Sequence, residues 1–387
     1  MPAQPNPPLI FAAASSAAMN QFAAAKSEWS KRLLRRAAGP ATGGVIPGAI
    51  TAGAVRRLSG TVSPRPEHNV VGVGVGEKIV DGRPTGEAAV KFFVRVKYPP
   101  GQVEAKAMLP KSIGGLPTDV EEAGVFRRLL PAAAGAARRG AGSRRRTARS
   151  RTGGAAAAPA RAQPATMPNP RTRIRPAQPG CSVGFRFPGD AFVMAGTFGA
   201  LVHKGTARYI LSNNHVLANE DQLAPGAPIF QPGLLDGGSA STDQIAELTR
   251  FIPLSNGKVD CAIARVHNKS DVSSDVLHIG APTGVAAPAF DMIVHKFGRT
   301  TSYTVGRITS VNTDVTVEYD TGNFFFADQI IIVGRSGKSF SNSGDSGSLI
   351  LQRQTNKAVA LLFAGSPSHT IANPLREVLA ALQVRLV

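Results

Sequence analysis

Alternation of apolar and polar residues predicts β structure in two separate parts of the chain. In the first, residues 69–80 and 87–99 are strand-like, and the turn sequence Asp-Gly-Arg-Pro-Thr-Gly between them predicts a hairpin. Residues 116–124 suggest one more short strand. The glycines of Gly-Val-Gly-Val-Gly lack the spacing of a nucleotide-binding loop, and no helix is expected to follow them. We therefore expect a small α+β accessory domain over residues 61–123.

The second part begins at Gly180. From there, short apolar runs alternate with Gly, Pro and Asn turns at roughly eight- to twelve-residue intervals, which is typical of an all-β sandwich or barrel. In this part only residues 373–384 predict a convincing helix. The length of the segment suits two small barrels better than one sandwich. We expect a mainly β domain over residues 180–387.

The N-terminal extension has a weaker pattern. Residues 17–38 can form a helix in which Phe22, Trp29 and Leu33 loosely share one face, and Gly-Pro follows it as a stop signal. Such a helix would either bind a partner or fray. We expect residues 1–60 to be an extension that is partly helical or disordered.

The charge of the chain is concentrated outside these patterned segments. Of the net charge of +19, the extension carries +6 and residues 124–179 carry +13, with thirteen arginines and no acidic residue. This Arg/Ala/Pro-rich segment has too little apolar character to fold, so we expect a disordered linker. Its arginines predict weak, salt-dependent polyanion binding through residues 127–176. The alternative is a plain spacer, since no aromatic residue lies between Phe126 and Phe185 to stack on bases.

Cysteine content and apolar run lengths bear on the compartment. Cys181 and Cys261 are too few for a disulfide framework, and we expect both to be free thiols. Residues 8–19 are mildly apolar but lack the basic flank of a secretory signal. No run reaches the ~18 apolar residues of a membrane-spanning helix. We expect no membrane span and a cytoplasmic location, with secretion as the alternative.

Candidate chemistry lies at the ends of predicted strands in the C-terminal part. A serine hydroxyl needs an adjacent base, and that base needs a third group to orient it. His215 follows an apolar strand in Tyr-Ile-Leu-Ser-Asn-Asn-His, Asp260 begins another in Val-Asp-Cys-Ala-Ile-Ala, and Ser346 lies in Ser-Gly-Asp-Ser-Gly-Ser. Each signal is weak by itself. The order His, Asp, Ser is that of chymotrypsin-type proteases and differs from that of α/β-hydrolases.

With these motifs together, residues 180–387 resemble trypsin-like (chymotrypsin-fold, S1-type) bacterial serine proteases. Leu-Ser-Asn-Asn-His-Val-Leu-Ala, Val-Asp-Cys-Ala-Ile-Ala and Asn-Ser-Gly-Asp-Ser-Gly-Ser are similar to the motifs around the family's base, aspartate and nucleophile. His-Lys-Phe-Gly-Arg-Thr-Thr is similar to a segment of the streptogrisin-like branch. The resemblance covers the C-terminal half strongly and residues 66–123 loosely.

The resemblance implies a role for each matching residue. Ser346 would be the nucleophile, His215 the general base, and Asp260 the group that orients the imidazole. The backbone N–H groups of Gly344 and Ser346 would form the oxyanion hole. Ser212 matches a hydroxyl that supports the aspartate. No metal and no cofactor are expected.

The resemblance also implies a specificity pocket. Phe340 occupies its base, where trypsins carry a carboxylate, and Ala364 and Gly365 lie on the strand that lines it. The serine that relatives carry on that strand is missing from Leu-Leu-Phe-Ala-Gly, which removes one support for the catalytic aspartate. We expect an apolar or small residue before the scissile bond.

A further expectation concerns activation. Asp345 matches the position that pairs with a newly cut N-terminal amine in trypsins, and a buried carboxylate needs a cationic partner. By resemblance to the streptogrisin-like segment, Lys296 would supply it, with Arg299 as a solvent-facing fallback. The uncut chain would then be competent without cleavage.

These observations favour a serine endopeptidase that hydrolyses a polypeptide substrate through an acyl-enzyme. The alternative is a non-catalytic binding module that keeps the trypsin-like barrel and tethers a polyanion, such as nucleic acid, through its arginine-rich linker.

Overall fold

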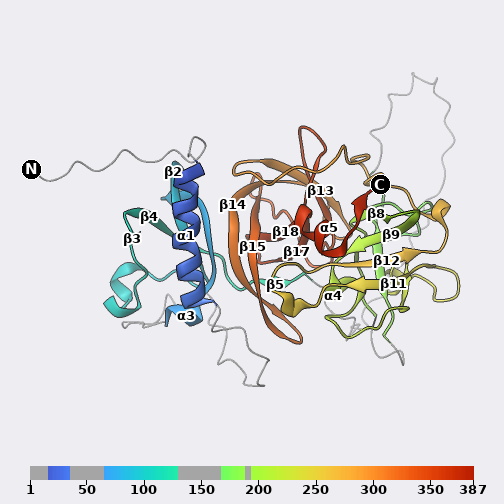
Figure 1. The fold of residues 1–387 in the computed structure, drawn as a ribbon, viewed down its shortest axis with the longest axis horizontal. Helices are drawn as coiled ribbons and strands as arrows, with labels where there is room; N and C mark the ends of the chain where they lie inside the picture. Colours follow the sequence, from blue (N-terminus) through green and yellow to red (C-terminus); the bar gives the residue numbers. More distant parts are fainter. Residues whose placement is uncertain (1–15, 35–64, 130–166, 188–192) are drawn as a thin grey trace, which may run out of the picture.

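The computed structural model describes residues 16–34, 65–129, 167–187 and 193–387. Its β structure forms two curled sheets, one of eleven strands and one of eight. The N-terminal unit lies at one end of the molecule, where its strands are part of the larger sheet, and the smaller sheet lies at the other end (Figure 1). Among the described residues, no helix has both the length and the apolar character needed to cross a bilayer.

The larger sheet contains a closed barrel. Its strands follow the order β13-β16-β17-β18-β15-β14, and β14 pairs back onto β13 to close the ring. Aliphatic side chains fill the interior. The bounds are β13 Ile293–Gly298, β14 Ser302–Tyr319, β15 Gly322–Gly334, β16 Leu349–Gln352, β17 Ala358–Gly365 and β18 Thr370–Pro374, with helix α5 Leu375–Leu382 following β18.

The N-terminal unit continues this same sheet. Beyond the stretch that pairs with β13, the edge of β14 pairs with β1, and the order continues β1-β2-β4-β3. Helix α1 packs on β1 and β2 through Phe22, Leu33 and Trp29, whose ring meets Phe92 edge-on at 5.6 Å. The bounds are α1 Ser16–Leu33, α3 Pro66–Asn69, β1 Val70–Val80, β2 Arg83–Val94, η2 Pro100–Gln102, η3 Ala105–Ala107, β3 Ser112–Ile113 and β4 Leu116–Glu122.

Small residues allow β1 to approach β14 closely. A Cβ at Gly74 would collide with the side chain of Thr313, and one at Gly76 would lie 2.7 Å from the Thr309 carbonyl oxygen. The glycines therefore serve strand packing. Across the same contact, Lys26 of α1 forms a buried ion pair with Asp314 at 2.7 Å.

A second polar link joins the unit to the barrel. Glu121 on β4 lies 2.8 Å from His369 Nε2 and 2.5 Å from the buried ammonium of Lys91. Burial acts to raise the pKa of Glu121, but the hydrogen bond with His369 and the charges of Lys91 and His369 outweigh it and lower this pKa to about 2. The unit and the barrel therefore share a carboxylate that stays charged.

The smaller sheet has the order β19-β8-β9-β12-β11-β10-β6-β7 and wraps a core that includes both cysteines. Cys181 and Cys261 are buried and free, as predicted. The bounds are β6 Ser182–Phe185, β7 Gly196–Thr197, β8 Ala200–Lys204, β9 Ala207–Ser212, α4 Asn214–Leu217, β10 Pro228–Phe230, η5 Leu234–Asp236, β11 Gln244–Phe251, η6 Leu254–Asn256, β12 Ala262–Val266, η7 Lys269–Asp271 and β19 Arg385–Leu386.

The predicted class, mainly β with a two-barrel, chymotrypsin-like C-terminal domain, is confirmed. Two details differ. Residues 302–319 form one long bulged strand instead of the short strands expected throughout this part, because β13, β1 and β15 pair along its edges. Residues 124–129 and 167–179, expected to be disordered linker, are packed against the barrels. Most of the predicted linker and extension lies outside the described residues, and the domain boundaries stay a prediction.

Candidate active site

The smaller sheet brings the histidine and the aspartate together. His215 lies in the short helix α4 just after β9, and Asp260 lies two residues before β12, which pairs with β9. His215 Nδ1 lies 2.5 Å from Asp260 Oδ2, and both side chains are fully buried. With the Nδ1 proton shared with the carboxylate, Nε2 is left as an acceptor, and it has no hydrogen-bond partner among the described residues.

A tyrosine that the sequence did not indicate completes the surroundings of Asp260. The Tyr319 hydroxyl at the end of β14 donates to Asp260 Oδ2 at 2.8 Å. Burial, followed by the charge of Asp260 and this hydrogen bond, raises the pKa of Tyr319 well above its usual value, so the phenol stays a donor. This hydroxyl provides the support that the missing serine of Leu-Leu-Phe-Ala-Gly would have given.

The predicted support from Ser212 is wrong. The Ser212 hydroxyl donates to the carbonyl oxygen of Thr197 at 2.8 Å, so it braces the neighbouring loop instead of the aspartate. The side-chain oxygen of Asn373 accepts from the Asp260 backbone N–H at 3.1 Å and holds the start of β12. Neither Asn373 nor Tyr319 lies in a motif, and both reach Asp260 from the other barrel.

Ser346 lies opposite, in the loop before β16, and is fully buried. Its hydroxyl does not bond to His215. It donates to the carbonyl oxygen of Leu129 at 3.0 Å, with a longer contact of 3.3 Å to the Phe363 carbonyl oxygen. The N–H of Gly344 donates to the same Leu129 oxygen at 2.8 Å. A peptide carbonyl thus lies where the resemblance predicts an oxyanion hole.

The loop around Gly344 is shaped to present that N–H. Gly344 has a φ of 96°, a left-handed conformation that favours glycine. A Cβ there would also collide with the hydroxyl of Thr300. The structure gives a hydrogen bond from the N–H of Gly344, whereas for Ser346, the second predicted donor, only the hydroxyl contacts Leu129 within the described residues.

Leu129 arrives in this site at the end of a short strand, β5 (Arg127–Arg128). Strand β5 pairs antiparallel with β17, with Arg128 opposite Ala364 and Arg127 opposite Gly365, and parallel with β14 at Glu318. Figure 1 shows the chain running from the N-terminal unit beneath the barrel to β5. The segment Phe126–Leu129 therefore adds an extended strand to the rim of the barrel and ends at Ser346.

The side chain of Leu129 enters the predicted specificity pocket. It is 9% exposed and packs in an apolar cluster that includes Phe340. A Cβ added to Gly365 would lie 3.4 Å from Leu129 Cδ1, so the glycine leaves room for this side chain. Phe340 is itself buried and places no carboxylate in the cluster.

The two arginines of the segment each pair with acidic side chains but differ greatly in their own exposure. Arg128 Nε lies 2.5 Å from Glu220 Oε1, with the arginine side chain 9% exposed and the glutamate 2% exposed. Arg128 also pairs with Asp320, and Glu220 accepts from Thr321 N and Oγ1 at 2.9 and 2.8 Å. Burial, partly opposed by the charge of Glu220, lowers the pKa of Arg128 from its usual value.

Arg127, by contrast, is a surface residue. Its side chain is 64% exposed and its Nε lies 3.1 Å from Glu318 Oε2. The preceding residue, Phe126, is fully buried beside Phe93 and in the cluster of Phe326 and Phe363. The segment thus presents a buried aromatic ring, an exposed arginine, a buried arginine and a buried leucine in succession.

The charge pair predicted behind the nucleophile is present. Lys296 Nζ lies 3.3 Å from Asp345 Oδ2, and both side chains are fully buried. Burial lowers the pKa of Lys296 from its usual value, opposed by Asp345. Asp345 also accepts from Thr300 N, Thr301 N and the Thr301 hydroxyl at 2.9, 3.1 and 2.7 Å.

Two expectations tied to activation are wrong in part. Arg299 does not face solvent, because it is buried and binds Asp236 through two hydrogen bonds of 2.5 and 2.6 Å. The cleft of the uncut chain is not open to an added substrate, because residues 126–129 fill it. The sequence missed this occupant since Phe-Arg-Arg-Leu-Leu reads as the beginning of the linker.

The arginine-rich linker is described only at its two ends. There, Arg127 and Arg128 pair with acidic residues of the barrel, and Arg173 pairs with Asp243 at 2.8 Å. The other linker arginines lie mainly in residues 130–166, outside the described part. Polyanion binding through 127–176 stays a prediction, with these end arginines already engaged.

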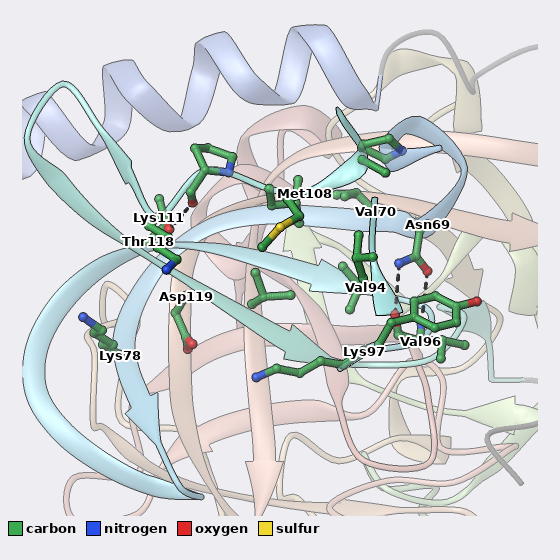
Figure 2. A pocket seen from close by; sticks show the side chains of 17 residues that line it. Asn69, Val70, Lys78, Val94, Val96, Lys97, Met108, Lys111, Thr118 and Asp119 are labelled. Atoms are coloured by element: carbon green, nitrogen blue, oxygen red, sulfur yellow. Dashed lines mark hydrogen bonds between the residues drawn. The ribbon is translucent and has the colours of Figure 1, made fainter. Parts of the chain in front are cut away.

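A separate pocket of about 400 Å³ lies in the N-terminal unit. Val70, Val94 and Met108 contribute apolar surface to it, with Lys97 and Asp119 among its polar lining residues (Figure 2). Neither the triad residues nor the segment Phe126–Leu129 lines it. It is therefore distinct from the site around Ser346.

Comparison with protein-family models and with curated proteins finds no match. Among solved structures, the chain is similar to Thermobifida fusca protease A, with 19% identity over 54% of this chain and 97% of that one and a TM-score of 0.40. A glutamic acid-specific serine protease shares 21% over 54% and 100%, with a TM-score of 0.39. An alpha-lytic protease homologue shares 21% over 56% and 100%, with a TM-score of 0.38. Because the similarity is distant, the chemistry rests on this chain's own residues.

Proposed function

We propose that this protein is a serine endopeptidase. The observation that carries the proposal is the Leu129 carbonyl oxygen, which accepts from both the Gly344 N–H and the Ser346 hydroxyl while its chain pairs with β17. The site thus binds an extended peptide and directs one of its carbonyl groups at a serine. A protein that only binds peptides would need the strand pairing with β17. It would not need the Gly344 N–H and the Ser346 hydroxyl to donate to the same carbonyl oxygen.

The proposed chemistry begins with a rotation of the Ser346 hydroxyl toward His215. His215 Nε2, a buried acceptor without a hydrogen-bond partner in the described part of the chain, takes the hydroxyl proton as Ser346 Oγ attacks the carbonyl carbon. Asp260, held by Tyr319, fixes the imidazole and stabilises the imidazolium. The Gly344 N–H stabilises the developing oxyanion, an effect worth about 10²–10³ in rate per donor.

The remaining steps release the two products. His215 returns the proton to the leaving amine as the carbon–nitrogen bond breaks, which leaves an acyl group on Ser346. Water, deprotonated by His215, then attacks the acyl group and regenerates the hydroxyl. The Lys296–Asp345 pair holds the loop that presents Gly344 throughout.

Hydrolysis of a reporter peptide tests this function. At a peptide concentration high enough to displace the bound segment, the full chain should release aminomethylcoumarin from acetyl-Phe-Arg-Arg-Leu-aminomethylcoumarin, and S346A should not. Because the segment Phe126–Leu129 occupies the cleft, a fluorophosphonate should label Ser346 slowly. Labelling should become faster when a substitution weakens the binding of that segment.

A folded wild-type chain that neither hydrolyses the peptide nor accepts the label would leave the non-catalytic binding module as the function. Circular dichroism of wild type and S346A provides the folding control for this comparison.

A further inference from the structure

The carbonyl group of Leu129 lies where the carbonyl of a substrate would be attacked. Leu129 fills the pocket, its carbonyl oxygen contacts Gly344 and Ser346, and the segment before it pairs with β17 in antiparallel register. The sequence continues from Leu129 to Leu130 and Pro131. The occupant is therefore positioned as the acyl side of a scissile bond.

We propose that the chain cleaves itself between Leu129 and Leu130, an inference that rests on the proposed function. Ser346 Oγ bonds to the Leu129 carbonyl carbon, and the bond to the Leu130 nitrogen breaks. The proton from the serine passes through His215 to that nitrogen, which leaves as a free amine. Water then hydrolyses the ester, so that Leu129 ends in a carboxylate and Ser346 recovers its hydroxyl.

The tether makes this an intramolecular reaction. Just upstream of the segment, the N–H groups of Ala123 and Gly124 donate to the Val94 carbonyl at 2.8 and 3.2 Å. Phe126 is locked in an apolar cluster, and its carbonyl accepts from the Glu318 N–H at 2.9 Å. A bond held in this way has a high effective concentration at the nucleophile. Cleavage should accordingly be independent of protein concentration.

The cut would not by itself release the N-terminal unit. Strand β1 remains paired with β14, Lys26 remains bound to Asp314, and Glu121 remains against His369. The new carboxyl end at Leu129 stays in the cleft as a bound product. The mature form is therefore a two-chain protein that inhibits itself until an added peptide displaces the segment.

Intact-mass measurement and N-terminal sequencing of the purified full chain test the proposal. Wild type should give two co-eluting fragments, one ending at Leu129 and one beginning at Leu130, at a rate unchanged by tenfold dilution. S346A should stay whole. L129D, which would bury a carboxylate in an apolar pocket, should slow the cut by about 100-fold or more. It should also speed fluorophosphonate labelling of Ser346, because the cleft is vacated.

Each of the other outcomes contradicts either the self-cleavage or the proposed endopeptidase function. An uncut wild type that hydrolyses the reporter peptide removes self-cleavage and leaves the endopeptidase. An uncut wild type without hydrolysis or labelling removes both. A cut elsewhere, or an S346A chain cut at the same bond, shows that the segment is not the substrate of this serine. Should S346A fail to fold, L129D with its labelling rate decides the question.

Discussion

The enzyme should strongly prefer peptide substrates with arginine at the position that Arg128 occupies. This position lies one residue before the residue whose carbonyl group is attacked. The peptide acetyl-Phe-Arg-Arg-Leu-aminomethylcoumarin reproduces residues 126–129, and a second peptide replaces the arginine at the Arg128 position by glutamine. In the structure this arginine faces Glu220 at 2.5 Å, with side-chain exposures of 9% and 2%. A peptide without it leaves a buried carboxylate unpaired.

The burial of the Arg128–Glu220 pair determines how much kcat/KM should fall when the arginine is replaced. Removing one partner of a buried, hydrogen-bonded charge pair costs about 3–5 kcal/mol. Since 1.4 kcal/mol corresponds to a factor of ten, the lower figure predicts a loss in kcat/KM of about 150-fold. Arg127 provides the matched comparison, because its side chain is 64% exposed and pairs with Glu318 at 3.1 Å. An exposed pair contributes about 0–1 kcal/mol, so glutamine there should cost less than about fivefold.

The assay is competition between peptides on the same full-length enzyme. The ratio of kcat/KM for two competing substrates does not depend on the fraction of enzyme that is free. The bound segment therefore cannot distort the comparison, whether or not it has been cut. Mass spectrometry of the two acetyl-tetrapeptide acids, which differ in mass, gives the ratio directly.

A protein variant adds the reciprocal test. E220Q keeps the shape of the side chain and its contact with Thr321 but removes the charge, so the preference for arginine should fall below about tenfold. Equal losses for the two substituted peptides would refute the reasoning from burial. A preference that survives E220Q would show that another group recognises the arginine.

Three further predictions concern the supports of the site. Tyr319→Phe removes a hydrogen bond to the buried Asp260, a contact worth about 1.5–3 kcal/mol, and should lower kcat by about 10–100-fold with KM unchanged in steady-state kinetics; an unaltered kcat would contradict it. Lys296→Met leaves Asp345 buried without its cation and should lower the free energy of unfolding by about 3 kcal/mol in urea and kcat more than 100-fold; a chain with full turnover would exclude the pairing role. The pKa of Glu121 in the folded protein is about 2, below its usual 4.5, so the carboxylate stabilises the fold by about 3 kcal/mol above pH 4.5, and this stabilisation is lost as the pH falls toward 2. E121Q should remove this loss from a plot of unfolding free energy against pH. Identical plots for wild type and E121Q would contradict the prediction.

Local patterns in the sequence were sufficient for the strands and for the candidate residues at their ends. Turn residues between alternating runs predicted the β1–β2 hairpin, and the order His215, Asp260, Ser346 suggested a site between two barrels. The family resemblance added Gly344 and the Lys296–Asp345 pair. These are features that short segments encode, because strand formation and loop shape depend on neighbouring residues.

Contacts between distant segments could not be predicted in this way. Tyr319 reaches Asp260 across 59 positions and from a different barrel, and no motif marks it. Ser212 has the right type and spacing for a supporting role, yet its hydroxyl points to Thr197. Strand addition of β1 to β14 likewise depends on which edge the barrel leaves unpaired.

The occupied cleft shows most clearly which features follow from the sequence alone and which require the tertiary structure. By itself, the sequence determined that residues 180–387 form short strands, that the net charge lies outside them, and that a serine follows a glycine-rich turn. Phe-Arg-Arg-Leu has no periodicity and borders a segment too polar to fold, so its composition indicates a linker. Only the tertiary structure supplied β17 as a pairing edge, Glu220 as a buried counter-charge and an apolar pocket for Leu129. A short extended segment is stabilised by the surface that receives it, and that surface exists only after both barrels have folded.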